Sequence, residues 1–310
     1  MAITDDTRIV IKVCQLYYEQ NLSQKEISAQ LGISRPQISR LLANARLNNI
    51  VSITINNPYA EETRLENELI KKYKIKDALV VDTTSETESN RFEVFSVQAA
   101  KHLYAYIRDN DLIGVMSGKT ISSLLNAVSD FERHGLDFIP LVGGIGVINP
   151  EWHANTIAQK FAEKTGGKSF VLNAPVIVQN EQACEIFRKE PEIASVLQRG
   201  RHCDVTIIGI GQVNMNSTNV RVGAYTQEDI ESLERSGAVA SVCTSYLNSQ
   251  GKIIETDLSK RSIGQTLSDI KKSKTIACAI GDSKVTSIKA ALQSGYIDVF
   301  MTDINTAKQL

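Results

Sequence analysis

The sequence predicts an α/β protein in which an N-terminal winged helix-turn-helix domain precedes a largely parallel sheet covered by helices. Two short helical patterns meet at Gly32, which is the arrangement of a helix-turn-helix. Beyond Asp77, short apolar runs alternate with helical stretches, as they do in parallel α/β sheets. A length of 310 residues suits about two domains.

The N-terminal segment has the spacing of a helix-turn-helix. A first helix is expected over residues 6–20, where apolar residues recur at helical spacing. The next helix starts after Ser23, which forms a capping-box pattern with Glu26, and Ser34 starts the one that follows. Seven positions hold the apolar, small or turn-forming residues that two closely crossing helices need: Ile27, Ser28, Leu31, Gly32, Ile33, Ile38 and Leu41.

The outer face of the helix after Ser34 carries residue types that contact DNA. Between Arg35 and Asn49 there are three arginines and no acid, although the net charge of the whole chain is −1. An ordinary helical hairpin would not explain this acid-free face, whereas DNA phosphates and base edges would. Arg35 and Gln37 are the expected base contacts. The full set of expected DNA contacts is Ser34, Arg35, Gln37, Ser39, Arg40 and Asn44.

Two further elements are expected between the helix-turn-helix and the sheet. Residues 51–57 alternate apolar and polar side chains, which predicts a half-exposed strand suited to a small wing. Residues 60–73 predict an amphipathic helix that either links the domains and helps to pair two chains or caps the next domain. The expected divisions are therefore residues 1–57, a linker helix over 58–76, and residues 77–310.

Glycine and polar residues collect where the expected strands of residues 77–310 end. In open parallel sheets, ligands bind beyond the carboxyl ends of the strands. A glycine turn followed by a helix brings amide groups and a positive helix end to an anion, and a lysine adds charge. One such turn could merely be a tight loop, but four favour a phosphorylated ligand. They contain Ser117, Gly118, Lys119 and Thr120; Gly143, Gly144 and Gly146; Gly209, Gly211 and Gln212; and Gly281, Asp282, Ser283 and Lys284.

The turn at Gly118 differs from a nucleotide-hydrolysing P-loop. That motif, GxxxxGK[ST], has four residues between its glycines, whereas Gly114 and Gly118 enclose only three. Gly114 is also expected inside the strand. The sequence therefore predicts phosphate binding at this turn without nucleotide hydrolysis.

Composition excludes several classes. No apolar run has the length of a membrane span, and the N-terminus lacks the basic start of a secretory signal, so a cytoplasmic protein without a membrane partner is expected. The five cysteines are scattered without a CxxC pair and are expected to be reduced and buried. The four histidines are dispersed as well, and no metal ligand or cofactor is expected.

Ordered motifs along nearly the whole chain resemble the bacterial SorC/DeoR-type sugar-binding transcriptional regulators. The motifs are "LSQKEISAQLGISRPQISRLL", "IGVMSGKT", "PLVGGIG", "ANTIAQKFAEKTGG" followed by "NAPVIV", "CDVTIIGIG", "GAVASV", and "AIGDSKVTSIKAAL" through "VFMTDINTA". The resemblance implies double-stranded operator DNA as one partner and a homo-oligomer, a dimer or tetramer. It also implies that residues 77–310 form an effector-binding and oligomerisation domain, like sugar-phosphate isomerases and deaminases in fold, that binds a phosphorylated sugar.

Carried over by position, the resemblance implies a set of effector contacts. Phosphate contacts would come from the first and last glycine turns, a pocket floor from the second, and polar contacts from the pocket edge. The implied residues are Ser117, Gly118, Lys119, Thr120, Gly143, Gly144, Asn155, Gln212, Arg221, Gly281 and Lys284.

The chain departs from the family pattern at three places. Ser117 replaces a tryptophan, which implies a more open wall, and Ala240-Ser241 replaces Gly-Asp, which removes a carboxylate. Val142 stands beside the pocket glycines where a lysine could form an imine with a sugar aldehyde, so covalent capture is not expected.

Two other functions stay open. A sugar-phosphate isomerase or deaminase fused to a DNA-binding segment would need a general base, and the pocket loops offer only Asp282, which is expected to be a helix N-cap. A constitutive DNA-binding protein could also retain a ligand domain that no longer responds. We expect a regulator with no catalytic residue rather than an enzyme.

Overall fold

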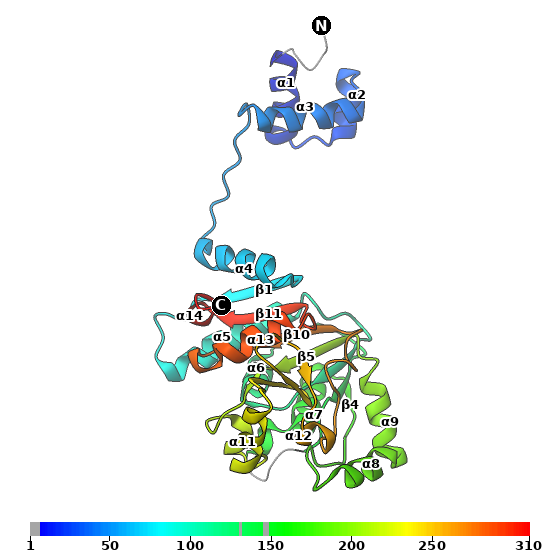
Figure 1. Ribbon diagram of the computed structural model, residues 1–310. Coiled ribbons are helices and arrows are strands. Elements are labelled where there is room, and N and C mark those ends of the chain that lie inside the picture. Colours follow the sequence, from blue (N-terminus) through cyan, green and yellow to red (C-terminus); the bar gives the residue numbers. More distant parts are fainter. Residues whose placement is uncertain (1–6, 130–131, 145–148) are drawn as a thin grey trace. The chain divides into compact units, whose positions relative to one another are not determined.

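The computed structural model describes residues 7–129, 132–144 and 149–310, which form two compact units, residues 1–58 and 59–310 (Figure 1). Asp6 of the expected first helix and Gly146 of the second glycine turn lie outside the described residues. Both expected classes of structure are present, a helix-turn-helix in the first unit and a helix-covered parallel sheet in the second.

The first unit is built from three helices and one π-helical turn. Its core joins all three helices, because Val13, Ile27, Ile38 and Leu41 are fully buried against one another. Burial of apolar side chains at these positions fixes the crossing of the two central helices. The elements are α1 (Thr7–Cys14), the π turn η2 (Gln15–Glu19), α2 (Gln24–Leu31) and α3 (Arg35–Leu47).

Local hydrogen bonds set the ends of α2 as its sequence predicts. The Glu26 amide donates to Ser23 Oγ at 3.3 Å, and the Ser23 amide donates to Glu26 Oε2 at 2.8 Å, which completes the capping box. Gly32 ends the helix in the left-handed region, at φ 65°. A side chain at Gly32 would strain that turn, so glycine is the residue that allows α3 to follow at once.

The expected wing is wrong. Residues 52–57 form no strand, and Ile53 and Ile55 are 57% and 83% exposed. Alternating side chains favour a strand only where a neighbouring strand supplies hydrogen bonds, and no such neighbour exists among the described residues of this unit.

A seven-stranded, fully parallel sheet organises the second unit, with the order β1-β11-β10-β5-β2-β3-β4. Alternate residues of the central strands enter two apolar cores, one on each face of the sheet. This two-sided burial explains why the strands are nearly continuous apolar runs. The strands are β1 (Asp77–Val81), β2 (Leu112–Val115), β3 (Asp137–Pro140), β4 (Lys168–Ser169), β5 (Val205–Gly209), β10 (Lys274–Cys278) and β11 (Val299–Asp303).

Helices cover both faces of this sheet (Figure 1). Phe95 of α5, Leu124 of α6 and Ile157 of α7 enter one core, whereas Leu65 of α4 and Ile288 of α13 enter the other. The helices are α4 (Ala60–Tyr73), α5 (Glu88–Leu103), α6 (Lys119–Ala127), α7 (Ala154–Thr165), α8 (Glu181–Lys189), α9 (Pro191–Gly200), α10 (Thr218–Arg221), α11 (Gln227–Arg235), α12 (Asp257–Lys260), α13 (Val285–Gln293) and α14 (Ile304–Ala307), with 3₁₀ turns η3 (Pro150–Trp152) and η4 (Asp282–Lys284).

Helix α4 belongs to the second unit and packs against its strand β1. Its Leu65, Leu69 and Tyr73 are buried in the core beside β1, and Glu66 Oε1 accepts a 2.9 Å hydrogen bond from the Val80 amide. These contacts favour the alternative in which the helix caps the second domain. Its participation in pairing two chains stays a prediction.

A small antiparallel sheet, β6-β7-β8-β9, was not expected. Its fourth strand, β9, pairs with β8 in antiparallel fashion. Strands of two or three residues are too short to show a period of two in the sequence. The strands are β6 (Gly211–Gln212), β7 (Ala240–Val242), β8 (Ser245–Leu247) and β9 (Ile253–Ile254).

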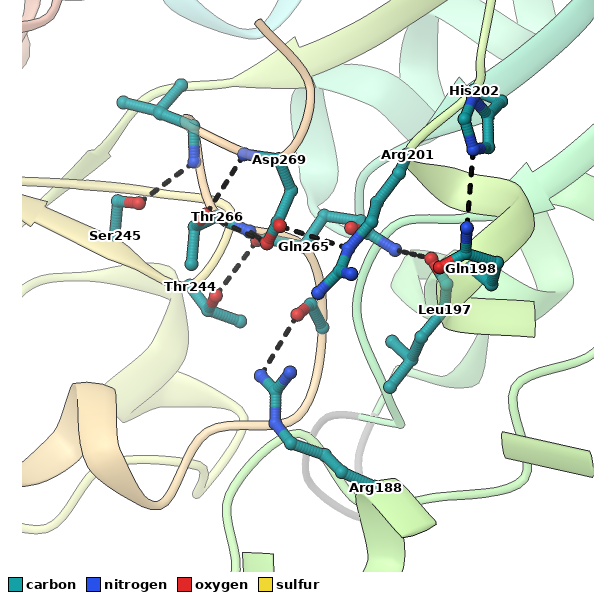
Figure 2. Close-up of polar contacts among 12 residues, drawn as sticks. Arg188, Leu197, Gln198, Arg201, His202, Thr244, Ser245, Gln265, Thr266 and Asp269 are labelled. Carbon is teal, nitrogen blue, oxygen red and sulfur yellow. Dashed lines mark hydrogen bonds and ion pairs between the residues drawn. The ribbon is translucent and has the colours of Figure 1, made fainter. Parts of the chain in front are cut away.

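A polar network fastens this small sheet to α9 (Figure 2). Thr244 Oγ1 donates to the carbonyl oxygen of Gln265 at 2.9 Å, and Gln265 Nε2 donates to that of Leu197 at 2.6 Å. Nearby, Arg201 Nε lies 3.1 Å from Asp269 Oδ1. The segment that contains Gln265 therefore bridges the β7-β8 hairpin and α9.

Gly114 lies inside β2, as expected, and its role there is packing. A Cβ at this position would lie 2.6 Å from Leu141 Cδ2 and 3.0 Å from Cys203 Sγ. We expect Gly114→Ala to lower the free energy of unfolding by about 1–3 kcal/mol, because the fully buried Leu141 has little room to move. Denaturant titration measures this loss. Gly209→Ala is the matched control, since the nearest atom to its Cβ would be 4.0 Å away; equal losses in the two variants would contradict the packing role.

Candidate DNA-binding surface and anion pocket

The expected DNA contacts of the first unit lie on one side of α3. Ser34, Arg35, Gln37, Ser39 and Arg40 are exposed, and Asn44 is half-buried. The opposite side of the helix supplies Ile38, Leu41, Leu42 and Ala45 to the core. Core packing thus directs the polar residues outward, as their helical spacing predicts.

Two side chains of α3 also have structural roles, and that of Gln37 is the capping role that its spacing from Ser34 predicts. Gln37 Oε1 accepts hydrogen bonds from the amide and the hydroxyl of Ser34, at 3.3 and 2.8 Å. Only the amide nitrogen of Gln37 then remains for a base edge. Arg46 Nε donates to Tyr18 Oη at 2.9 Å, which ties this arginine to η2. Lys25, which sequence reasoning did not select, borders a shallow hollow together with Arg35 and adds positive charge beside α3.

The second unit contains a cavity of about 480 Å³ at the carboxyl ends of β2, β5, β10 and β11. This is the position where parallel sheets bind ligands, and the volume suits a small molecule. Eight of the residues that the resemblance implies line it: Ser117, Gly118, Lys119, Thr120, Gln212, Arg221, Gly281 and Lys284.

Gly143, Gly144 and Asn155 do not line the described cavity. A Cβ on Gly143 would lie 2.5 Å from the carbonyl oxygen of Ala174, and the Gly144 amide donates to that oxygen at 2.8 Å. Gly143 therefore allows close packing of two backbone segments, whereas a Cβ at Gly144 would lie 3.8 Å from that oxygen, an ordinary contact. Asn155 Nδ2 donates to the carbonyl oxygen of Leu172 at 3.1 Å, and Asn155 Oδ1 accepts from the Leu172 amide at 2.9 Å. These two bonds hold the segment at Leu172 in place.

One end of the cavity is built to receive an anion. Gly118 precedes α6 at φ 128°, and Gly281 precedes η4 at φ 113°. A Cβ at either glycine would meet no atom within 4 Å, so backbone conformation, and not packing, favours glycine there. The first intrahelical bond of α6 is donated by Ser122 to Gly118, which leaves the preceding amides of the helix for a ligand.

Two lysines place positive charge at the same end. Burial, and secondly the charge of Lys119, lower the pKa of Lys284 to about 8. Lys119 is exposed, and its ammonium lies 4.5 Å from the ring centre of Phe92. Neither lysine forms an ion pair with a carboxylate in the described part of the chain. An anion bound between them would relieve their mutual repulsion.

The remaining wall of the cavity is polar and largely neutral. Gln212 is only 9% exposed, and its Oε1 has no hydrogen-bond partner in the structure, so it is available to accept a bond from a hydroxyl. Ser241, at the place where the family has an acid, lies in the same wall.

Two carboxylates also border the cavity, and both already have partners. Asp282 is not the expected N-cap; Gly281 occupies that position, and Asp282 Oδ1 accepts from Gln309 Nε2 at 2.9 Å. Asp303, which sequence reasoning missed, is 2% exposed, and its Oδ1 caps α14 by accepting from the Thr306 amide at 3.1 Å. Each of these carboxylates thus has at least one oxygen held by a group of the protein.

Several other lining residues come from segments that the motifs did not mark. Trp152 enters the wall from η3, and its carbonyl oxygen accepts from the Gly118 amide at 2.8 Å. It supplies an aromatic side chain to the wall that Ser117 was expected to leave more open. Trp152 is the single tryptophan of the chain, and this rarity is the one mark in the sequence that could have pointed to it. Arg91, Phe92 and the polar run 216–219 complete the wall.

The expectations about cysteine are confirmed, since all five are free and buried. Among residues 7–129, 132–144 and 149–310, no three His, Cys, Asp or Glu side chains gather as a metal site would require. No helix in the same ranges is both long and apolar enough to cross a membrane.

Comparison with known proteins identifies both units. Residues 57–310 match a family model described as "Putative sugar-binding domain", and residues 4–48 match the model of sigma-70 region 4. The deoxyribonucleoside regulator of Bacillus subtilis (strain 168) is 28% identical over 304 residues, which cover 98% of this chain and 97% of that protein. The sorbitol operon regulator of Klebsiella pneumoniae is 27% identical over 318 residues, which cover 100% and 99%.

Solved structures agree. The full-length sorbitol operon regulator SorC from Klebsiella pneumoniae superposes with a TM-score of 0.76 at 26% identity over 98% of each chain. A DeoR family transcriptional regulator from Listeria monocytogenes superposes with a TM-score of 0.74 at 28% identity, and the match covers 80% of this chain and 98% of that one.

The lowered pKa of Lys284 predicts that anion binding depends on pH. Sulfate keeps a constant charge in the alkaline range, so its affinity should follow Lys284, which is charged below a pH of about 8 and neutral above it. We expect calorimetric sulfate affinity to fall on the order of tenfold between about pH 7.5 and about pH 9.5. Lys284→Met should bind weakly with little pH dependence, and Lys289→Met on α13 should behave like the parent protein. A flat profile for the parent protein would contradict this role of Lys284.

Proposed function

Because the chain belongs to the SorC/DeoR family of sugar-binding transcriptional regulators, we propose that it controls a carbohydrate catabolic operon and that a phosphorylated sugar modulates its binding to operator DNA. The relatives described above are regulators and not enzymes.

The observation that carries the effector's chemistry is the pair of lysines at the glycine turns. Two positive charges without a carboxylate partner among the described residues, one of them on a half-buried side chain, favour the binding of an anion. A phosphate group supplies the charge and accepts from the first amides of α6. The neutral wall with Gln212 and Ser241 suits the hydroxyl groups of a sugar.

The remaining parts of the proposal concern DNA and assembly. The exposed residues of α3, Arg35 and Arg40 foremost, would enter the major groove of double-stranded operator DNA. Operators of this kind are usually bound by symmetric dimers, which supports a homo-oligomer, a dimer or tetramer. Access to the chromosome also implies a cytoplasmic location.

The effector hypothesis is tested with a panel of sugar phosphates and the matching free sugars. We expect at least one sugar phosphate, and not its free sugar, to raise the melting temperature of the full chain. The same compound should change operator affinity, and Lys284→Ala should weaken that response by about tenfold to a hundredfold while ligand-free DNA binding stays intact. Lys289→Ala is the matched control.

The outcome of the panel separates the alternatives. Turnover of a panel member would favour the enzyme, and a compound that binds without changing operator affinity would favour constitutive DNA binding. If no sugar phosphate stabilises the protein, the effector hypothesis is wrong.

The DNA-binding surface is tested by Arg40→Ala. Removal of one phosphate-neutralising charge from α3 should weaken operator binding and reduce the slope of log affinity against log salt by about 1. Fluorescence anisotropy over a salt series measures both quantities. Lys101→Ala removes one exposed charge from α5 in the second unit and should leave the slope unchanged; identical behaviour of the two variants would contradict the assignment to α3.

A further inference from the structure

Residues 303–310, here called the C-terminal turn, contact both the anion end of the cavity and helix α4. The turn follows β11, contains α14, and lies beside α4 (Figure 1). Its side chains bond to the loop 281–284 on one side and to α4 on the other. It is therefore a physical connection between the lysine-bearing loop and the first helix of the second unit.

On the cavity side, two hydrogen bonds hold the loop 281–284. The Gly281 amide donates to Thr306 Oγ1 at 2.9 Å, and Thr306 is fully buried. Gln309 Nε2 donates to Asp282 Oδ1 at 2.9 Å. The position of the loop, and with it of Lys284, is thus tied to the C-terminal turn.

On the helix side, the turn reaches both ends of α4. Lys308 Nζ lies 2.8 Å from Glu61 Oε1, in the first helical turn of α4. The carbonyl oxygen of Leu310 accepts from Tyr73 Oη at 2.9 Å and also from Lys72 Nζ, in the last helical turn. These contacts attach the whole length of α4 to the C-terminal turn.

Burial makes this connection stiff. Ile304, Ala307 and Leu310 are 2%, 5% and 8% exposed and belong to the same core cluster as Leu65 and Leu69 of α4. Close-packed side chains of this kind move together rather than deform separately. A displacement of the loop by a bound anion therefore acts on a packed block that includes α4.

Helix α4 is also the first element after the DNA-binding unit, which ends at Pro58, whereas α4 begins at Ala60. Any shift at Glu61 changes the point from which the chain leads back to that unit. The arrangement suits a signal that starts at the anion and ends at the junction of the two units.

We propose that the C-terminal turn positions the loop 281–284 and couples its occupancy by an anion to helix α4. Thr306 and Gln309 are the positioning residues on the loop side, and the Lys308–Glu61 pair carries the coupling to the start of the helix. The inference rests on the proposed function, because it takes the cavity as the effector site and the first unit as the DNA-binding unit.

Hydrogen exchange of the full chain, with and without saturating inorganic phosphate, tests the coupling. In the parent protein, phosphate should slow exchange in peptides that cover residues 281–284. It should also slow exchange in peptides that cover residues 60–73 by about fivefold, at the lower end of usual coupling between sites. Phosphate is the probe because the loop is expected to bind the anionic group of any effector.

Two variants interrupt the connection on different sides. Gln309→Ala removes the bond to Asp282. Lys308→Met removes the pair with Glu61, in which the Lys308 side chain is 45% exposed and that of Glu61 is 51% exposed. Exposed pairs contribute little to stability, so Lys308→Met is expected to fold. In both variants phosphate should still protect the loop, but the response of residues 60–73 should be weakened. Arg64→Met is the control, because it breaks an exposed pair with Glu68 within α4 itself.

Each result bears on a different statement. Agreement of the phosphate-free exchange maps of variant and parent protein excludes simple loss of structure. If the loop responds to phosphate but α4 does not, or if both variants keep the α4 response undiminished, the C-terminal turn does not couple the two and the inference is wrong while the anion site stands. If the loop itself fails to respond in the parent protein, the anion site of the proposed function is wrong, and this inference is wrong with it.

Discussion

The gathering of two lysines at the carboxyl edge of the parallel sheet is the physical constraint that governs one end of the cavity. Lys119 follows β2 and Lys284 follows β10, and the two strands flank β5 in the sheet. Lys284 is half-buried, and the desolvation of its ammonium, followed by the charge of Lys119, lowers its pKa to about 8. Parallel strands, glycine-capped helix starts and a packed C-terminal turn all serve to fix these charges in place. These features hold two positive charges at one end of the cavity, and such a site favours an anion.

Local signals in the sequence predicted much of this architecture. The capping box at Ser23, the left-handed Gly32 and the core spacing of Ile27 and Ile38 involve residues close in the chain, so their consequences are visible without the fold. The lysine turns are predictable for a related reason: consecutive strands of a parallel sheet end on one edge, which brings their turns together whatever the details. The expected DNA contacts, which are the N-cap Ser34 and five residues of α3, avoid the core for the same local reason.

The remainder depended on partners that the sequence does not specify. Gly143 and Asn155 serve contacts with Ala174 and Leu172, and their roles follow from which backbone segment lies opposite. Trp152 joins the cavity through a contact between separate segments, and the short strands of the antiparallel sheet have no periodicity. The strand predicted at residues 51–57 is wrong for a different reason. The alternating pattern suits a strand, but hydrogen bonding to a neighbouring strand decides whether one forms.

Burial of Lys284 has a thermodynamic consequence for any anion that binds beside it. In the empty cavity the side chain is partly deprotonated at mildly alkaline pH, because its pKa is about 8. A bound phosphate favours the ammonium form, so occupation of the site draws a proton from the solvent. The heat of binding would then include the ionisation enthalpy of the buffer. The concentration of such an anion needed for half-occupancy would then rise as the pH rises.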